Sequence, residues 1–239
     1  MAQIKLFDPF TRIDGTTLEH FSTHWHTRHA EIAKGLPQIK HYIQSHRRED
    51  APAALGAPLG ACWADGSSET WYDGPEEITA MFELPALTAL MEDERNFMDT
   101  HRERYHVITR EQHIDGPELS PCTGVKALLF TRRDPALTQE DFFAAWITPD
   151  DAELGRAVGA TRHVVCPRVA SPFDHPNPEV EESSLPPFDG VRELWWESTE
   201  ALAAGAAADP DAWARLVHPP TVDAGGSFAL YASERLIIR

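Results

Sequence analysis

The sequence predicts an α+β fold built from two tandem ferredoxin-like repeats. In residues 1–111 the patterned segments follow the order strand, helix, strand, strand, helix, strand. This order returns in residues 125–239, after a stretch rich in proline and glycine at residues 112–124. The segment VKALLFTRRDPALTQEDFFAAW also follows IKLFDPFTRIDGTTLEHFSTHW, with Phe142 and Trp146 at the positions of Phe21 and Trp25. We therefore expect a domain at 1–111, a linker at 112–124 and a second, degenerate repeat at 125–239.

The first repeat supplies a clear signal for each of its elements. A helix is predicted over residues 16–36, because its apolar side chains recur at steps of three and four residues and form one stripe. Residues 47–66, rich in alanine, proline and glycine, are predicted to form a loop. The remaining expected elements are strands at residues 4–8, 39–46, 67–73 and 104–111 and helical pieces at residues 75–84 and 85–93.

The second repeat keeps the same order with two departures. Pro149 interrupts the helix that follows Trp146, because proline lacks the amide that a helix interior needs. Residues 167–189 are acidic and contain six prolines, which predicts a solvated surface loop. The second copy also has Ile147 and Asp150 where the first has His26 and His29, so the two halves are not equivalent sites.

Composition limits the partners of the chain. Its 38 acidic and 21 basic residues give a net charge of -17, which disfavours binding to nucleic acid or to anionic membranes. No apolar run is long enough to span a bilayer, and the N-terminus resembles no secretion signal, so we expect a cytoplasmic protein. Three scattered cysteines predict reduced thiols and no disulfide framework. Exposed sheet edges favour a homodimer, whereas the acidic surface opposes one.

Four histidines lie on the first predicted helix. At about 100° per residue, His29 lies within the apolar stripe beside Trp25, whereas His20 and His24 point away from it. His20 and His24 are spaced as a metal-binding pair, but no third ligand accompanies them, so we expect a solvated pair and no metal site. His26 lies three residues before His29 on a neighbouring part of the helix surface.

The residues resemble the EthD-domain proteins of the dimeric α/β-barrel superfamily, in two tandem copies. The features that carry this resemblance are Trp25 before the pair His29-Ala30, Pro37, Tyr42 and His46 in the next strand, Glu69, Trp71 and Tyr72 with their echo Glu193, Trp195 and Trp196, and ERNFMDTHR around Phe97. The resemblance implies that two ferredoxin-like sheets form a barrel within one chain and that a substrate binds between sheet and helices. Relatives include cofactor-free isomerases, cyclases, dehydratases, decarboxylases and oxygenases, haem enzymes, and proteins with no assigned reaction.

A candidate active site follows from the histidines and the resemblance together. His29 and Tyr42 are the predicted catalytic residues, because a histidine can move protons at neutral pH and a phenol can donate to a substrate oxygen. The resemblance alone places Tyr42 and His46 in the pocket. For each residue the plain alternative is a role in packing. The predicted substrate-binding residues are His26, His46, Trp71, Phe97 and His101.

The leading functional hypothesis is a cofactor-independent lyase (a dehydratase, a decarboxylase or an enzyme that releases an aldehyde by C–C cleavage) or an isomerase. It would act on a small aromatic, polyketide-like or other hydrophobic oxygenated compound by general acid–base catalysis. The sequence contains no phosphate-binding glycine loop, nucleophile elbow or dinucleotide fingerprint, which favours a reaction without a nucleotide cofactor. One alternative is a cofactor-free or haem-dependent oxygenase of the same superfamily. The other is a non-enzymatic accessory or binding protein of a catabolic pathway.

Overall fold

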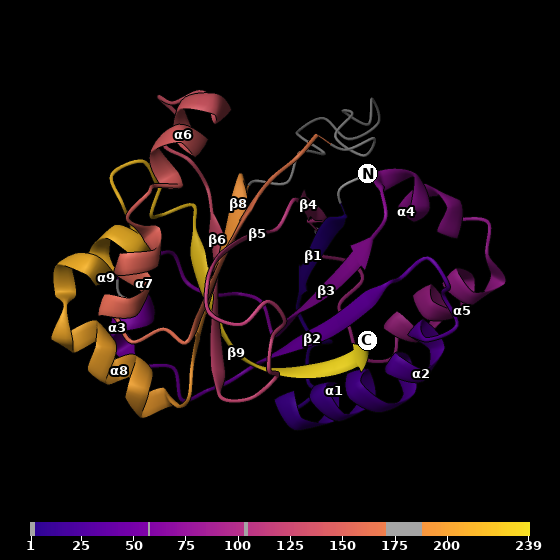
Figure 1. Ribbon diagram of the computed structural model, residues 1–239. Helices are drawn as coiled ribbons and strands as arrows, with labels where there is room; N and C mark the ends of the chain where they lie inside the picture. The colour runs from indigo at the N-terminus through magenta and orange to yellow at the C-terminus, as the bar shows by residue number, and fades with distance from the viewer. Residues whose placement is uncertain (1–2, 57, 103–104, 171–187) are drawn as a thin grey trace.

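The protein consists of two halves with the same order of elements (Figure 1). A computed structural model describes residues 3–56, 58–102, 105–170 and 188–239. The first half contains β1 (Ile4–Phe10), α1 (Leu18–His24), η1 (Trp25–His29), α2 (Ala30–Ala33), β2 (His41–Arg47), α3 (Ala53–Gly56), β3 (Gly66–Tyr72), α4 (Pro75–Met81), α5 (Pro85–Glu94) and β4 (Val107–Thr109). The second contains β5 (Gln112–Asp115), β6 (Val125–Thr131), α6 (Gln139–Trp146), α7 (Asp151–Ala157), β7 (Arg162–Pro167), β8 (Gly190–Trp196), α8 (Thr199–Ala208), α9 (Pro210–Val217) and β9 (Phe228–Ile238).

The sheet confirms the predicted fold class. Its strand order is β4-β1-β3-β2-β9-β6-β8-β7-β5, so each half has the same internal order, with its fourth strand beside its first. The last strand of the second half also reaches the first half, because β9 pairs with β6 through its first residues and with β2 through its last. β5, which follows β4 in the chain, pairs with β7.

The two ends of the sheet meet because β4 and the residue after it bond to the end of β7 and the residues that follow it. Only residues 110 and 111 separate β4 from β5. The Val169 amide donates to the Ile108 carbonyl at 2.9 Å, and the Arg110 amide donates to the Pro167 carbonyl at 3.1 Å. Within the described residues, these contacts remove the exposed sheet edges that favoured a homodimer in the sequence analysis. The homodimer itself stays a prediction.

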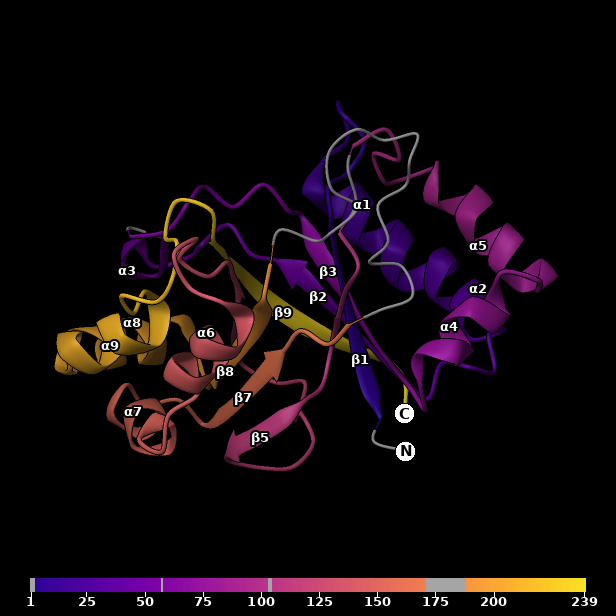
Figure 2. The ribbon, with the colours of Figure 1, turned by 90° about the horizontal axis from the view of Figure 1, so that it is seen from above.

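Helices cover the barrel on two opposite sides, with α1, α2, α4 and α5 on one side and α6 to α9 on the other, where α3 of the first half also lies (Figures 1 and 2). Residues 112–115, which we assigned to the linker, form β5 instead, because the free edge of β7 offers them backbone partners. The division into two domains around that linker stays a prediction. Within the described residues, no helix combines the length and apolar character needed to cross a membrane. Residues 171–187 of the predicted solvated loop lie outside the described residues.

Strict alternation along the strands separates two faces of the sheet. In β1, Lys5 and Phe7 face the barrel interior, whereas Leu6, Asp8 and Phe10 face the helices. The pairing register of the strands shows which positions of the two halves correspond. Lys5 lies opposite Trp71 between β1 and β3, as Lys126 lies opposite Trp195 between β6 and β8.

The barrel interior holds a buried network of ions. The Lys5 ammonium lies 2.8 Å from Glu69 and 2.5 Å from Glu193. The Lys126 ammonium lies 2.7 Å from Glu69, 2.5 Å from Glu193 and 2.9 Å from Glu234. Each lysine therefore pairs with glutamates of both halves, and all five side chains are at most 2 % exposed.

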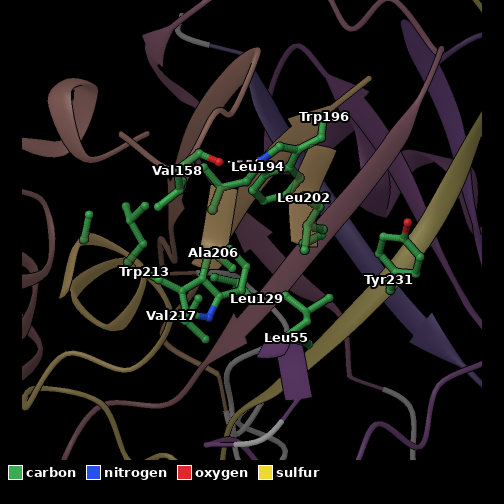
Figure 3. Close-up of a cluster of buried hydrophobic side chains, with 14 of the residues drawn as sticks. Leu55, Leu129, Val158, Leu194, Trp196, Leu202, Ala206, Trp213, Val217 and Tyr231 are labelled. Atoms are coloured by element: carbon green, nitrogen blue, oxygen red, sulfur yellow. Dashed lines mark hydrogen bonds between the residues drawn. The ribbon is translucent and has the colours of Figure 1, made fainter. Parts of the chain in front are cut away.

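The helix-facing side of the second half is a packed core. Apolar side chains of β6 and β8 meet those of α7, α8 and α9, including Leu129, Leu194, Trp196, Val158 and Trp213 (Figure 3). Nearby, the buried Arg192 guanidinium donates to the Trp146 carbonyl at 2.7 Å and to Asp151 at 3.0 Å. The register places Ser68 at the corresponding position of the first half, where no such bulk crosses from sheet to helix.

Two corresponding glycines let the helices approach the sheet. A Cβ atom at Gly66 would lie 2.6 Å from the Trp25 ring, and one at Gly190 would lie 2.7 Å from the Trp146 ring. We expect Gly66→Ala and Gly190→Ala each to destabilise the fold by roughly 1–3 kcal/mol through overpacking. Differential scanning calorimetry should show a lower Tm for both. Gly56→Ala, where no atom lies within 4 Å of the added Cβ, is the control. A Tm equal to that of this control would contradict the proposed contact.

The ion network should control stability in acid. Burial alone would raise the pKa of Glu193, but the charges of Lys126 and Lys5 outweigh it and hold the pKa below its ordinary value of 4.5. Stability from this group is present above pH 4.5 and is lost as the pH falls below it. We expect Lys126→Met to lower the free energy of unfolding at pH 7 by roughly 3–5 kcal/mol, because it leaves buried carboxylates unpaired.

On acidification, the Lys126→Met variant should lose less further stability than the unmodified protein does. Protonation of its unpaired glutamates removes the free-energy cost of burying their charges. Urea unfolding between pH 7 and pH 3 measures both effects. Lys34→Met removes a partly exposed ammonium that pairs only with Glu31 among the described residues, and it serves as the control. Parallel curves of stability against pH for the Lys126 variant and the unmodified protein would rule out this role of the network.

Candidate active site

A cavity of about 230 Å³ lies between the first half's sheet and its helices. Its wall is mainly apolar, with side chains from β1, β2 and β3 on one side and from η1, α2, α4 and α5 on the other. The polar or ionisable residues in the wall are Asp8, His29, Tyr42, Ser68, Thr70, Tyr72, Glu94 and His106. The cavity thus brings the two predicted catalytic residues, His29 and Tyr42, together with the predicted Phe97.

A π-helical turn at Trp25–His29 sets the direction of His29. The Ala30 amide donates to the Trp25 carbonyl five residues earlier, which is the hydrogen-bond step of a π-helix. In an α-helix, residues five apart point about 140° away from each other at about 100° per residue. The π turn instead brings His24 and His29 to one carboxylate, that of Asp93 on α5.

Asp93 gathers donors from the neighbouring helix. His29 Nδ1 lies 3.2 Å and His24 Nε2 lies 3.1 Å from Asp93 Oδ2, and the Arg28 Nε donates to Oδ1 at 2.9 Å. Burial would raise the Asp93 pKa, but hydrogen bonding and charge from His24 and the charge of His29 outweigh it and lower that pKa. The result is a buried carboxylate that fixes the ring of His29.

The prediction for His24 was wrong in this respect. His20 is exposed as expected, but the His24 side chain is only 17 % exposed and bonds to Asp93. The reason is twofold: the π turn rotates the helix face, and α5 packs over the side on which His24 lies.

Tyr42 faces the helices from β2. Its hydroxyl accepts hydrogen bonds from Trp25 Nε1 at 3.0 Å and from Gln44 Nε2 at 3.2 Å. Burial raises the pKa of Tyr42, against the opposing effect of these two hydrogen bonds. Tyr42 therefore stays protonated and remains a hydrogen-bond donor.

His26 and His46 lie together on the other side of Trp25 from the cavity. His46 packs against the Trp25 ring with centroids 4.3 Å apart, and its Nδ1 and Nε2 lie 2.7 Å from Ser22 Oγ and 3.0 Å from Gln44 Oε1. The His26 ring lies edge-on to that of His46 at 6.2 Å. The structure does not bring either histidine into the cavity wall.

Two further predicted residues also lie elsewhere. Trp71 faces the barrel interior, where its ring stacks on Lys5 and its Nε1 donates to Glu111 at 3.1 Å. His101 lies on an exposed segment beside a second hollow. Phe97 lies in the cavity wall, where its ring meets that of His29 edge-on at 4.9 Å.

Three carboxyl groups at the site, those of Asp8, Asp93 and Glu94, were not predicted from the sequence. Asp93 and Glu94 lie in the acidic stretch MEDER, where the sequence does not distinguish buried carboxyl groups from exposed ones, and the pairing of α5 with η1 reveals the role of Asp93. Asp8 had a weak signal, since it alternates with Leu6 and Phe10 on one strand face that should be apolar.

A metal ion does not suit the barrel interior. Oxygen and sulfur atoms of Glu111, Cys166 and Glu193 lie within 4.8 Å of one another. The Lys5 ammonium already pairs with this group, at 2.5 Å from Glu193 and 3.6 Å from Glu111. Burial also raises the pKa of the Cys166 thiol far above its ordinary value, so sulfur stays protonated and is a poor ligand.

Fold and site together define a dimeric α/β-barrel protein whose two ferredoxin-like units lie in one chain. The family model of the EthD domain matches residues 13–101, which lie in the first half of the chain. This confirms the resemblance identified in the sequence. No curated protein sequence matches the chain.

Solved structures share the fold along nearly the whole chain. An anthrone oxidase-like protein has a TM-score of 0.59 at 13 % identity and covers 99 % of this chain and 94 % of its own. A protein from Fusobacterium nucleatum named as a candidate monooxygenase gives 0.57 at 8 % identity, with 98 % and 94 % covered. A chlorite dismutase variant from Candidatus Nitrospira defluvii gives 0.53 at 10 % identity, with 97 % and 91 % covered.

The superfamily includes haem enzymes, but the cavity does not suit haem. Haem carries two propionates, and among the described lining residues there is no lysine or arginine to receive them. The carboxyl groups of Asp8 and Glu94 lie in the wall instead. In the second half, the corresponding space between sheet and helices is filled by buried apolar side chains and Arg192.

The burial of His46 leads to a prediction on protonation. Burial lowers its pKa to about 2, and the charge of Arg235 acts in the same direction. Because the unfolded chain binds this proton near pH 6.5, stability from neutral His46 is present above pH 6.5 and is lost as the pH falls. We expect its ring nitrogens to show no protonation between pH 8 and pH 4.5 in ¹⁵N NMR spectra, with the exposed His20 as reference. A midpoint near 6.5 for His46 would contradict the described packing.

Proposed function

We propose that the cavity binds a small, uncharged aromatic or other hydrophobic oxygenated compound and that His29 removes a proton from it. The observation that carries this proposal is the geometry of His29. Its ring lies in the wall of an apolar cavity, and its Nδ1 is held 3.2 Å from the buried carboxylate of Asp93. A histidine oriented in this way by a carboxylate has the arrangement of a general base.

The wall of the cavity supports this class of substrate. Apolar and aromatic side chains form most of it, which favours flat hydrophobic ligands. Phe82 and Met91 belong to the wall and are also 59 % and 49 % exposed, so the cavity opens through an apolar entrance. Among the described lining residues no lysine or arginine offers a counter-ion, which disfavours anionic substrates.

The proposed first step is a proton transfer. The Nε2 atom of His29 takes a proton from a carbon adjacent to or conjugated with a carbonyl group. The electron pair of the broken C–H bond forms a new C=C bond, and the C=O π pair moves onto the substrate oxygen, which gives an enolate. The imidazolium so formed donates Nδ1–H to Asp93, which stabilises its charge. Tyr42, which stays protonated, can donate to the developing oxyanion.

The reaction then depends on the fate of the enolate. Expulsion of a hydroxyl group from the neighbouring carbon, released as water with the proton held by His29, makes the enzyme a lyase, and return of the proton at another carbon makes it an isomerase. Reaction with molecular oxygen makes it a cofactor-free oxygenase. The shared fold with an anthrone oxidase-like protein and a candidate monooxygenase supports the oxygenase as strongly as the side chains support the lyase.

The accessory-protein hypothesis shares the cavity but not the chemistry. A protein that only binds its ligand needs apolar walls and a polar anchor, and both are present. It does not need a histidine fixed by a buried carboxylate, a feature that costs free energy to bury. This pairing makes the enzyme the better supported proposal.

Hydrogen exchange in anthrone tests the proton transfer. Its methylene protons are acidic and exchange with D₂O when a base removes them. We expect the protein to accelerate this exchange and His29→Ala to lower the acceleration by roughly 10²–10⁴-fold, as for loss of a general base. Asp93→Asn should lower it as well. His20→Gln, which removes an exposed histidine of the same helix, should leave it unchanged.

Oxygen electrode and mass measurements in the same reactions separate the fates of the enolate. Oxygen consumption with incorporation of ¹⁸O supports the oxygenase, and a product lacking a small fragment supports the lyase. Exchange at the same rate in folded His29→Ala protein would remove the base assignment. Tight binding of anthrone without accelerated exchange would favour the accessory protein.

A further inference from the structure

Asp8 is a buried carboxyl group in the cavity wall opposite the helices. It is 5 % exposed and lies on the helix-facing side of β1, in register with Ser68 of β3. His29 and Asp93 approach the cavity from η1 and α5. The cavity wall therefore carries His29 on the helix side and Asp8 on the sheet side, with a second carboxyl group, that of Glu94, on α5.

The second half shows what this fold accepts at the same position. Asp8 lies opposite Ser68, and Leu129 lies opposite Arg192, so the register makes Leu129 the counterpart of Asp8. Leu129 is buried and belongs to an apolar core. Because an apolar side chain suits this position, packing of sheet against helices does not require the carboxyl group that the first half places there.

Asp8 shares the cavity wall with the hydroxyl groups of Tyr42 and Tyr72 and with His106, whose Nε2 lies 3.7 Å from Asp8 Oδ2. Tyr42 lies in the cavity wall and already accepts two hydrogen bonds, from Trp25 and Gln44, so its remaining role is to donate its own proton. Burial raises the pKa of Tyr72 to about 12, with the charge of Asp8 acting in the same direction. A substrate hydroxyl at this wall would thus meet an acceptor, Asp8, and a donor, Tyr42.

We propose that Asp8 determines specificity by accepting a hydrogen bond from a hydroxyl group of the substrate, which is a phenol, an enol or an alcohol on an apolar ring system. This inference rests on the proposed function for the location of the substrate. It narrows the substrate from hydrophobic oxygenated compounds in general to those that donate a hydrogen bond. It also gives Asp8 a role in excluding carboxylates, whose charge it would repel.

A pair of shape-matched probes tests this selectivity. 2-Naphthol and 2-methylnaphthalene differ by a hydroxyl against a methyl group, and 2-naphthoate adds a charge. We expect the protein to bind 2-naphthol roughly ten- to hundredfold more tightly than 2-methylnaphthalene, the value of a hydrogen bond to a charged group. It should bind 2-naphthoate more weakly than either. Isothermal titration calorimetry measures all three Kd values.

Variants at Asp8 locate the selectivity. Asp8→Asn and Asp8→Leu should each bring the Kd ratio of 2-naphthol to 2-methylnaphthalene close to one. Asp14→Asn, which alters an exposed carboxylate outside the cavity wall, should leave the ratio unchanged. Asp8→Leu should also melt at or above the Tm of the unmodified protein, because leucine is the residue of the corresponding position in the second half.

Each opposite result would overturn the proposal. Equal affinity of the unmodified protein for 2-naphthol and 2-methylnaphthalene, or no binding of either, excludes the selectivity. Unchanged selectivity in folded Asp8→Asn protein assigns it to another group. A Tm that falls in both Asp8 variants makes Asp8 a structural residue. His29→Ala should keep the preference for 2-naphthol while losing proton exchange, so failure of the base assignment and failure of this proposal are distinguishable.

Discussion

The architecture depends on two buried lysines that pair with two buried glutamates at the centre of the barrel. Lys5 and Lys126 come from the corresponding strands β1 and β6, and Glu69 and Glu193 come from the corresponding strands β3 and β8. A slip of one residue in either strand would turn these charges toward the helices, where apolar side chains would leave them unpaired. The network therefore fixes the register of both halves, and its cross-pairing requires that they assemble together.

With register fixed inside, the outer faces of the two sheets are free to differ. One scaffold gives a cavity in the first half and a solid core in the second. Two pairs of corresponding positions show this: the first half has Ser68 and Asp8 where the second has Arg192 and Leu129. Both halves keep the packing tryptophan of the first helix, which is Trp25 in the first half and Trp146 in the second. Packing and chemistry are thus separate in this chain, as the loss of histidines from the second repeat indicated.

Much of the fold was accessible to sequence reasoning because repetition and strand alternation are local patterns. The alternation also separated Tyr42 from His41, but it could not tell which face meets the helices, since both faces of a barrel are buried. For this reason Trp71 was predicted to lie in the pocket, whereas the structure places it inside the barrel. Angular placement assumed an α-helix throughout, and the π turn at Trp25–His29 leaves no mark in the sequence that we could recognise. Asp93 was not predicted because its hydrogen-bond partners are distant in the chain and leave no local pattern.

The π turn explains why the site needs a helix from elsewhere in the fold. A regular α-helix would point His24 and His29 in different directions, and one carboxylate could not serve both. With the turn in place, the His29 ring contacts Asp93 of α5 through Nδ1 and also lines the cavity. Asp8 and Tyr42 occupy the opposite wall on the rigid sheet. Our two proposals together place the C–H bond of a substrate toward the helices and its hydroxyl toward the sheet, so the orientation of the molecule follows from the barrel that holds both walls.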